Sequence, residues 1–466
     1  MALVMGVDSS TQSTKVSIHD ADSGKLVASG RAAHPPTGSA PISEANPLDW
    51  WTAFQAAYGD AGAPPVAAVS VGGQQHGMVT LDVGGQPVRK AKLWNDTESA
   101  PDASWCMKQL PEGAKAWAHA TGSVPVAAFT VTKLSWLHRS EPANWDRVAK
   151  VCLPHDYLTH RLTGEFTTDR GDASGTGYFS PVTNEYCWDI LSIVDSLRDW
   201  SSMVPRVLGP LDVAGQWGDV TVACGTGDNM AAALGVGLQP GDVVVSIGTS
   251  GTVYSVSSTP TADPSGAVAG FADATGRYLP LVCTLNATRV TETVRRLLAV
   301  GYEEFDALAM SGNAGADGLT LVPYLDGERT PNRPHSRGML SGISTSTSRE
   351  NLARASVNGV ICGLLDGLDA LSAADAQTDG RLLIVGGGAQ SMAYVQTLAD
   401  LSGRAVTVAS GDEFVAIGAA RQAASAVAGG WVDWPVPSSA IVDPALAESE
   451  RADVRGAFAV ERDRSI

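Results

Sequence analysis

Basic residues are scarce in this sequence. Lysine and arginine number 32 against 49 aspartates and glutamates, so the 466-residue chain carries a formal net charge of −17. Nucleic acids and anionic membranes are bound through basic surfaces that release counterions, so we expect neither as a partner. A small anionic nucleotide remains compatible with this charge, because backbone amides, helix N-termini and a divalent cation can hold phosphates without a basic patch.

Long apolar runs and paired cysteines are also missing. The chain is 44% hydrophobic and 17% charged, a mixture typical of globular domains. Its first residues, MALVMGVDSS, lack the basic segment of a signal peptide, and we expect a cytoplasmic protein. The six cysteines form no CxxC pair and have no nearby pair of histidines, which favours reduced, mostly buried thiols over a zinc site or a disulfide framework.

Apolar β-branched runs alternate with helical patterns along the chain, as they do in α/β folds. Strands are predicted at residues 3–7, 16–18, 66–71, 78–81, 151–153, 243–247, 253–256, 319–322 and 382–385. Helices are predicted at residues 293–300, 349–371, 391–401 and 414–428. The stretch after Val436 is rich in Ala, Ser, Asp, Glu and Arg, which predicts a surface segment or a frayed tail.

The length favours two domains, since 466 residues exceed what one hydrophobic core accommodates. MGVDSSTQSTKVSI from Met5 and VSIGTSGTVYSV from Val245 both read as strand, Gly/Ser/Thr turn and strand, which indicates an internal duplication. The Gly/Pro-containing segment GVGLQPGD precedes the second copy. We therefore place the boundary near residues 236–242 and expect domains at 1–238 and 239–466.

Three turns have the composition of phosphate-binding loops. Ser9–Thr14 and Gly248–Gly251 are crowded with small residues, whose amides and hydroxyls can point at phosphate oxygens. Gly386–Ala389 follows a predicted strand and precedes a helix, although GGGAQS is not the G-x-G-x-x-G fingerprint. The N-terminal turn is not a P-loop either. Lys15 can add charge at the phosphates, but a solvated, structural lysine is the alternative at that position.

Two aspartates are candidates for chemistry. Asp8 ends the first predicted strand, where a carboxylate can hold a hydrated Mg²⁺ or simply stabilise the turn. Asp228 directly precedes an Ala-rich helix in GTGDNMAAALGVG, where it can be an ordinary N-cap or a catalytic base. Flanking glycines permit close approach of a ligand, and Asn229 can hydrogen-bond a sugar hydroxyl. Phosphoryl transfer requires positioning, charge neutralisation and one base.

Two polar and aromatic clusters, Gln74-Gln75-His76 and Trp94-Asn95-Asp96, adjoin apolar runs. Sugar pockets combine hydrogen-bonding groups with an apolar wall in this way. A lone histidine is more often structural than functional, so His76 requires independent support.

The chain resembles the FGGY carbohydrate kinases, within the larger superfamily of sugar kinases, actin and heat-shock-protein ATPases. The resemblance spans nearly the whole chain and is carried by GVDSSTQSTKV, SEANPLDWW, GGQQHGMVTLD, KLWNDTES, DYLTHRLTGEFTTDRGDASGT, GTGDNMAAALGVG, SIGTSGTV, YLDGERTPNRPHSRG and GGGAQS. It implies an α/β fold of two ribonuclease H-like, actin-like ATPase domains with a catalytic cleft between them.

The resemblance also implies roles for individual residues. Asp228 matches the catalytic base, and Asp8 matches the acid that acts through Mg²⁺; both are expected metal contacts. Expected ATP contacts are Thr11, Lys15, Gly248, Thr249, Gly386, Gly387, Gly388 and Ala389. Expected sugar contacts are Gln75, His76, Trp94, Asn95, Asp228 and Asn229. A homodimer is a family-level expectation.

The resemblance favours a pentulose substrate phosphorylated at its 5-hydroxyl, with D-xylulose preferred. Several positions depart from the pattern of the D-xylulose kinases: Gln75 replaces a usual Met, Glu98 a usual Arg, Gln390 a usual basic residue and Tyr394 a usual Trp. D-ribulose, L-xylulose, arabinitol and other pentitols therefore stay open as substrates. WNDTES also lacks the Arg-Glu pair that grips glycerol in related kinases. A partner-driven ATPase and a sugar-responsive regulator are the non-enzyme alternatives, although no basic DNA-binding segment precedes Met5.

Overall fold

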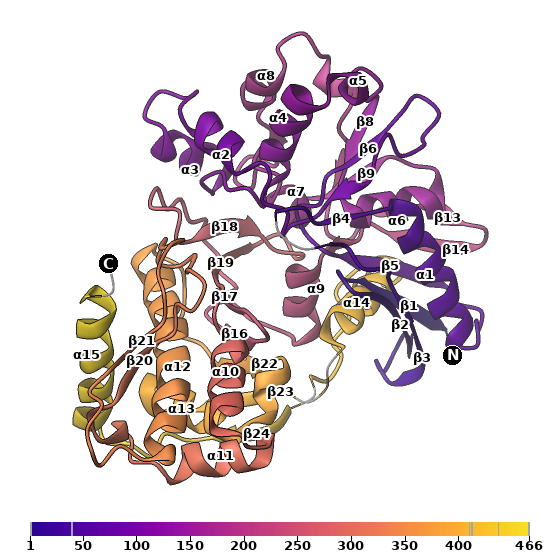
Figure 1. Cartoon of the computed structure of the whole chain (residues 1–466). Coiled ribbons are helices and arrows are strands. Elements are labelled where there is room, and N and C mark those ends of the chain that lie inside the picture. Colours follow the sequence, from indigo (N-terminus) through magenta and orange to yellow (C-terminus); the bar gives the residue numbers. More distant parts are fainter. Residues whose placement is uncertain (1, 39–40, 410, 412, 437, 465–466) are drawn as a thin grey trace. The chain divides into compact units, whose positions relative to one another are not determined.

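The computed structural model of the chain describes residues 2–38, 41–409, 411, 413–436 and 438–464 (Figure 1). The chain divides into two compact units. Unit 1 comprises Met1–Leu238, Ser258–Leu279 and Glu413–Val436, and unit 2 comprises Gln239–Ser257, Pro280–Asp412 and Pro437–Ile466. Each unit thus contains segments from distant parts of the sequence. Among the described residues, no helix is long and apolar enough to cross a membrane.

Unit 1 is built on a mixed sheet with the strand order β13-β14-β5-β1-β2-β3, and β15 also pairs with β5. Its strands are β1 (Leu3–Ser9), β2 (Ser13–Asp20), β3 (Leu26–Ala33), β4 (Glu44–Ala45), β5 (Ala68–Gly73), β6 (Val79–Leu81), β7 (Ala91–Lys92), β8 (Lys150–Cys152), β9 (Thr167–Asp169), β10 (Phe179–Ser180), β11 (Glu185–Tyr186), β12 (Arg206–Leu208), β13 (Val213–Trp217), β14 (Val220–Ala223), β15 (Thr226–Gly227) and β18 (Ala269–Ala272). Its helices are α1 (Pro47–Asp60), α2 (Ala100–Met107), α3 (Ala114–Thr121), α4 (Thr130–Ser140), α5 (Pro142–Trp145), α6 (Pro154–Thr163), α7 (Arg170–Ala173), α8 (Trp188–Val194), α9 (Asp228–Gly235) and α14 (Phe414–Ala428), with a 3₁₀ turn at Trp200–Ser202.

Unit 2 contains a second mixed sheet, with the order β19-β17-β16-β22-β23-β24. Its strands are β16 (Val243–Ile247), β17 (Gly251–Ser255), β19 (Tyr278–Thr284), β20 (Thr320–Val322), β21 (Met339–Ser341), β22 (Leu382–Val385), β23 (Val406–Ala409) and β24 (Ser438–Val442). Its helices are α10 (Thr288–Leu298), α11 (Tyr302–Ser311), α12 (Arg349–Ala373), α13 (Met392–Ser402) and α15 (Glu448–Arg464), with 3₁₀ turns at Ala316–Gly318 and Gly387–Gln390.

The two sheets share one topology. In unit 1, β3, β2 and β1 are antiparallel neighbours, β1, β5 and β14 run parallel, and β13 closes the edge antiparallel. In unit 2, β19, β17 and β16 are antiparallel, β16, β22 and β23 run parallel, and β24 closes the edge antiparallel. The predicted α/β class and internal duplication are therefore confirmed.

Helices α1 and α14 cover opposite faces of the unit 1 sheet. Side chains alternate between the faces of a strand, so Val7 and its partner Val16 point one way while Val4 and Gly6 point the other. Val7 and Val16 share a core with aromatic residues of α1, whereas Val4 packs with the alanines of α14. A Cβ on Gly6 would lie 1.8 Å from a carbonyl oxygen of α14, so only glycine permits this close packing.

Of the two alternatives for the stretch after Val436, the frayed tail is wrong, while residues 448–464 do form a largely surface-exposed segment. Residues 438–442 form β24 and residues 448–464 form α15, whose Phe458 is only 3% exposed. Arg455 and Arg462 of α15 form ion pairs with Asp366 of α12 at 3.4 and 2.6 Å. The composition of this segment suggested a tail because one buried aromatic residue and several ion pairs leave little apolar pattern to recognise.

Candidate active site

Three parallel strand ends gather most of the candidate residues of unit 1. β5 pairs with β1 on one side and with β15 on the other, so Gly72 lies opposite both Asp8 and Thr226. Gly73 likewise lies opposite Ser9 and Gly227. Since carboxyl ends of parallel strands meet at one sheet edge, the residues that follow these strands share that edge. The register therefore places the two candidate acids at the same edge of the sheet.

Asp228 is the first residue of α9 and not its N-cap. Gly227 occupies the N-cap position, so the simple capping alternative for Asp228 is wrong. Its Oδ1 accepts hydrogen bonds from the Asn229 backbone N at 2.8 Å and from Asn229 Nδ2 at 3.0 Å. Burial raises the pKa of Asp228 to about 7, and the negative charges of Asp8 and Asp172 add to this effect. A carboxyl group with such a pKa can exchange a proton near neutral pH.

Asp8 is 4% exposed at the end of β1. Burial raises its pKa to about 6, although Lys15, whose Nζ lies 3.8 Å from Asp8 Oδ2, partly offsets that rise. Within the described residues, Asp8 Oδ1 has no hydrogen-bond partner. An orphaned carboxylate oxygen near a second, half-buried acid, Asp228, suits a hard cation such as Mg²⁺, which prefers oxygen ligands and neutralises the repulsion between two carboxylates.

Lys15 faces Asp8 across the β1–β2 pair and binds Glu413 at 3.0 Å. Glu413 lies next to the start of α14, about 400 residues away in the sequence. The sequence contained no signal for this partner, because only the fold brings α14 beside β1. The ion pair supports the structural alternative for Lys15 and leaves its predicted phosphate contact as an expectation.

Gln75 and Asn229 link two of the strand ends. Asn229 Nδ2 donates to Gln75 Oε1 at 2.7 Å as well as to Asp228. An ionised Asp228 carboxylate can only accept hydrogen bonds, so these bonds fix the orientation of both amides. A Cβ on Gly227 would lie 2.8 Å from Gln75 Cγ, which shows how closely Gln75 packs against the N-cap of α9.

His76 has a left-handed backbone with φ of 64°, uncommon for a residue with a Cβ. Its Nδ1 lies 2.8 Å from the carbonyl oxygen of Gly175 and must donate, since a carbonyl only accepts. A Cβ on Gly175 would lie 2.4 Å from the His76 ring. Gly175 was missed by sequence reasoning, although its place in the family-like block RGDASGT could have drawn attention to it.

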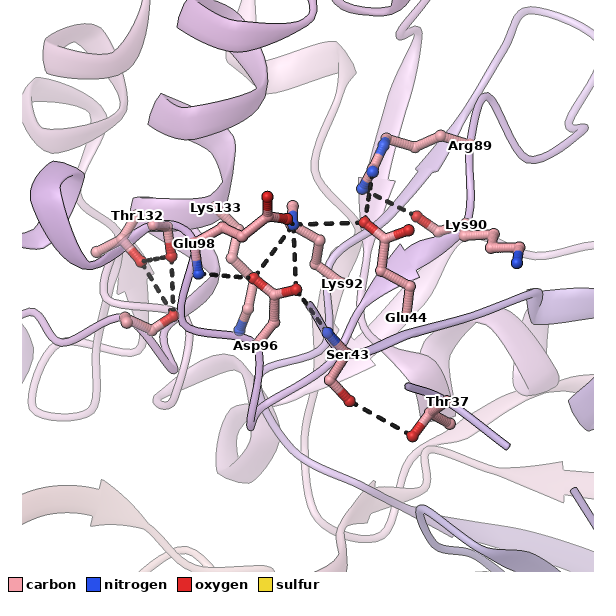
Figure 2. A network of polar contacts seen from close by, with 12 residues as sticks. Thr37, Ser43, Glu44, Arg89, Lys90, Lys92, Asp96, Glu98, Thr132 and Lys133 are labelled. Atoms are coloured by element: carbon pink, nitrogen blue, oxygen red, sulfur yellow. Dashed lines mark hydrogen bonds and ion pairs between the residues drawn. The ribbon is translucent and has the colours of Figure 1, made fainter. Parts of the chain in front are cut away.

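Trp94 and Asn95 lie on a loop that is fixed by a network of buried ion pairs around Lys92. Figure 2 shows the buried Lys92 ammonium between carboxylates: both oxygens of Asp96 lie at 3.1 Å, and Glu98 and Glu44 are also paired with it. Trp94 Nε1 donates to Thr11 Oγ1 at 3.0 Å. The candidate sugar loop thus reaches the predicted phosphate-binding turn of the same unit. Glu98, one of the positions expected to depart from the family pattern, pairs with Lys92.

A buried cluster of His155 and three aspartates supports the strand that precedes Asp228. His155 Nδ1 donates to Asp172 Oδ2 at 2.7 Å, and Asp169 accepts from Thr226 Oγ1 at 2.7 Å. Burial alone would lower the pKa of His155, but the carboxylates of Asp156 and Asp172 raise it to about 10. The positively charged His155 imidazolium therefore offsets the negative charge of the neighbouring aspartates. The sequence did not reveal this role.

The remaining candidates belong to unit 2, where the two Gly-rich turns share a sheet edge. Ser246 of β16 lies opposite Val385 of β22, and the turns Gly248–Ser250 and Gly386–Ala389 follow these strands. Gly386 has φ of 86°, and a Cβ on Gly388 would lie 2.4 Å from Ile247. The second turn therefore packs beside the end of β16. Gly387 and Ala389 lie in its 3₁₀ turn, and Thr249 is exposed at the tip of the first turn.

Comparison with known families and proteins gives concordant matches. Residues 3–235 match the N-terminal domain of the FGGY family of carbohydrate kinases, and residues 243–427 match its C-terminal domain. The xylulose kinase of Streptomyces coelicolor is 50% identical over 438 residues, covering 92% of this chain and 88% of the relative. The crystal structure of xylulose kinase from Bifidobacterium adolescentis is 41% identical, with a TM-score of 0.90 and 99% of both chains covered.

A more distant structure carries information on the fold alone. The glycerol kinase of Plasmodium falciparum, solved with ADP, has a TM-score of 0.90 at 18% identity and covers 100% of this chain and 98% of its own. Kinases with differently named substrates thus share this architecture. The fold therefore does not select the sugar.

Proposed function

Because the chain belongs to the FGGY family of carbohydrate kinases, we propose that it transfers the terminal phosphoryl group of ATP to D-xylulose and forms D-xylulose 5-phosphate. The membership confirms the predicted family, the carbohydrate kinase activity and the two-domain fold of the actin-like ATPases. The xylulose kinases that are 50% and 41% identical to this chain support D-xylulose as the acceptor.

The observation that carries the mechanism is the half-buried Asp228 at the start of α9, whose pKa is raised to about 7. In this proposal its carboxylate accepts the proton of the sugar 5-hydroxyl as that oxygen attacks the phosphorus. A positioned base contributes about 10²- to 10⁴-fold to such a step. Asn229 orients the carboxylate through its two bonds to Oδ1.

The sugar contacts proposed in unit 1 are Gln75, His76, Trp94, Asn95 and Asn229. Gln75 and Asn229 already share a hydrogen bond beside Asp228, which supports their assignment to one pocket. Trp94 is 40% exposed and offers an apolar surface, while Asn95 Oδ1 has no hydrogen-bond partner in the part of the chain that the structure describes. Together these groups offer the hydrogen bonds and the apolar wall that a sugar requires.

The nucleotide contacts proposed are Thr11 and Lys15 in unit 1 and the turns with Gly248, Thr249 and Gly386–Ala389 in unit 2. Backbone amides of such turns can bind phosphate oxygens without a basic patch. Asp8 and Asp228 would hold Mg²⁺, directly or through water. When bound, the ion neutralises phosphate charge during transfer.

The substitution Asp228→Asn tests the role of the base. Asparagine preserves shape and hydrogen bonding but cannot accept the proton, so kcat should fall at least about 100-fold while ATP still binds. Asp102→Asn is the matched control, because Asp102 is a buried carboxylate of α2 that pairs with Arg139. It should affect stability and leave kcat near wild type. Normal turnover by a folded Asp228→Asn protein would refute the assignment.

A coupled ADP-release screen tests the sugar. D-xylulose, D-ribulose, L-xylulose, arabinitol and glycerol are compared at equal concentration, and D-xylulose should show the highest kcat/KM. A better acceptor among the others would replace the proposed substrate and leave the kinase assignment intact.

A further inference from the structure

The carbonyl oxygen of His76 is held by two side chains of a single helix. Lys133 Nζ donates to it at 3.0 Å and Thr130 Oγ1 at 3.2 Å. Both residues lie in the first turn of α4, three positions apart, so their side chains share one face of that helix. Both side chains are fully buried. Lys133 also donates to the carbonyl oxygen of Ala128, which fixes its ammonium against the helix entrance.

These donors act on a backbone that needs support. A residue with a Cβ adopts the left-handed conformation of His76 only when its surroundings enforce it. The ring is fixed separately, through the Gly175 carbonyl and through contacts with Phe129 and Phe271 at centroid distances of 5.0 and 5.4 Å. The carbonyl and the ring are thus held from opposite ends of the residue, and loss of either restraint should let the other shift.

A lysine is a costly choice for this purpose. Burial lowers the pKa of Lys133 to about 7, with Asp96 favouring and Lys92 opposing its charged form. Figure 2 shows Lys133 beside Asp96, whose carboxylate is bound to Lys92. No ion pair of Lys133 occurs within the residues that the structure describes. An apolar side chain would avoid the cost of desolvating a charge. The buried ammonium of Lys133 is instead used to donate hydrogen bonds to backbone carbonyl oxygens.

The same helix face also contacts the second candidate sugar segment. Lys92 Nζ lies 3.9 Å from the ring centroid of Trp136, one turn beyond Lys133 in α4. The carbonyl of Lys92 accepts from the Met78 backbone N at 2.8 Å, which ties the Trp94 loop to the segment after His76. Helix α4 therefore contacts and supports both candidate sugar segments, the His76 turn and the loop that contains Trp94.

We propose that Lys133, assisted by Thr130, is a positioning residue that sets the His76 turn for sugar binding. This inference rests on the proposed function, because it requires His76 to contact the sugar. Lys133 touches neither reacting group, so it should govern the sugar KM and leave nucleotide binding unchanged.

Steady-state kinetics with D-xylulose and ATP test the proposal. Lys133→Met should raise the sugar KM about tenfold, while the ATP KM stays within about twofold and kcat changes less than the sugar KM. Thr130→Val preserves shape and removes the weaker donor, so we expect the sugar KM to rise about two- to threefold. The double variant should exceed the product of the single effects, since the carbonyl then loses both donors.

Controls separate positioning from general damage. Lys108→Met removes an exposed lysine of the same unit and should leave both KM values unchanged. Lys133→Gln retains a donor and should restore part of the sugar affinity, and it replaces Lys133→Met if that protein does not fold. An equal rise in both KM values, or a sugar KM within twofold of wild type in the folded double variant, overturns the proposal. Absence of any sugar phosphorylation by the wild type would instead refute the proposed function.

Discussion

Replacing Gly418 with alanine should separate two helices that position the candidate base. Gly418 lies within α14, where an added Cβ would stand 1.8 Å from the carbonyl oxygen of Ala231 and 2.9 Å from the backbone N of Gly235. Both atoms belong to α9, which begins at Asp228. Because the obstructing atoms are backbone, no side-chain rotation can relieve the clash, and the helices must move apart.

The size of the effect follows from that geometry. Contacts below 3.0 Å essentially never occur at a real Cβ, so the helices must separate by about 1.2 Å. Overpacking of a core costs about 1–3 kcal/mol, and we expect about 3 kcal/mol here because the contact is rigid. For a unit of this size, such a loss lowers the melting temperature by about 5 °C. Displacement of α9 should also lower kcat, since 1 Å of misplacement can cost about 100-fold.

Differential scanning calorimetry and steady-state assays measure both effects, with Gly59→Ala as the matched control. Gly59 is also helical, but a Cβ there would meet nothing within 4 Å, so alanine should stabilise unit 1 by up to about 1 kcal/mol. Opposite signs for the two glycines are the expected result. If Gly418→Ala melts at or above the wild-type temperature with full activity, the close helix contact is not a determinant of the site.

Two further predictions concern the site itself. Gly175→Ala would place a Cβ 2.4 Å from the His76 ring, so the sugar KM should rise about tenfold with little change in the ATP KM. A sugar KM equal to that of the wild type would contradict the role of His76. The pKa of about 7 for Asp228 predicts a pH dependence, because only the ionised carboxylate accepts a proton. The sugar kcat/KM should rise about tenfold between pH 6 and pH 8, and a flat pH–rate profile would argue against a base with this pKa.

Local patterns in the sequence were sufficient for elements with a strong apolar signal. β16 at Val243–Ile247, β22 at Leu382–Val385 and α14 at Phe414–Ala428 have the predicted bounds, since their apolar residues follow the strand or helix period. Helix α10 begins at Thr288, five residues earlier than predicted. The prediction missed its first turn because that turn is mainly polar. Strands such as β13 and β14 were not predicted, as each contains a polar residue and is only partly buried.

Long-range packing was beyond prediction. Helix α14 follows unit 2 segments in the sequence but packs on β1 and α9 of unit 1, through Gly6, Gly235 and Gly418. Isolated glycines in a sequence do not indicate which backbone they approach. For the same reason, the partners Glu413 of Lys15 and Gly175 of His76 became visible only in the fold.

The candidate acids illustrate how function depends on register more than on local sequence. Asp8 after an apolar strand and Asp228 before an Ala-rich helix each have an ordinary structural explanation, and periodicity alone cannot rank the alternatives. The parallel pairing of β1, β5 and β15 places Asp8 opposite Gly72 and Gly227 opposite Gly73, so the two carboxyl groups share one sheet edge. Burial raises both pKa values, to about 6 for Asp8, where the charge of Glu413 adds to the rise, and to about 7 for Asp228, where the charges of Asp8 and Asp172 add to it. A pair of stabilising turn or cap residues would gain nothing from that arrangement, whereas a base beside a cation-binding acid requires it.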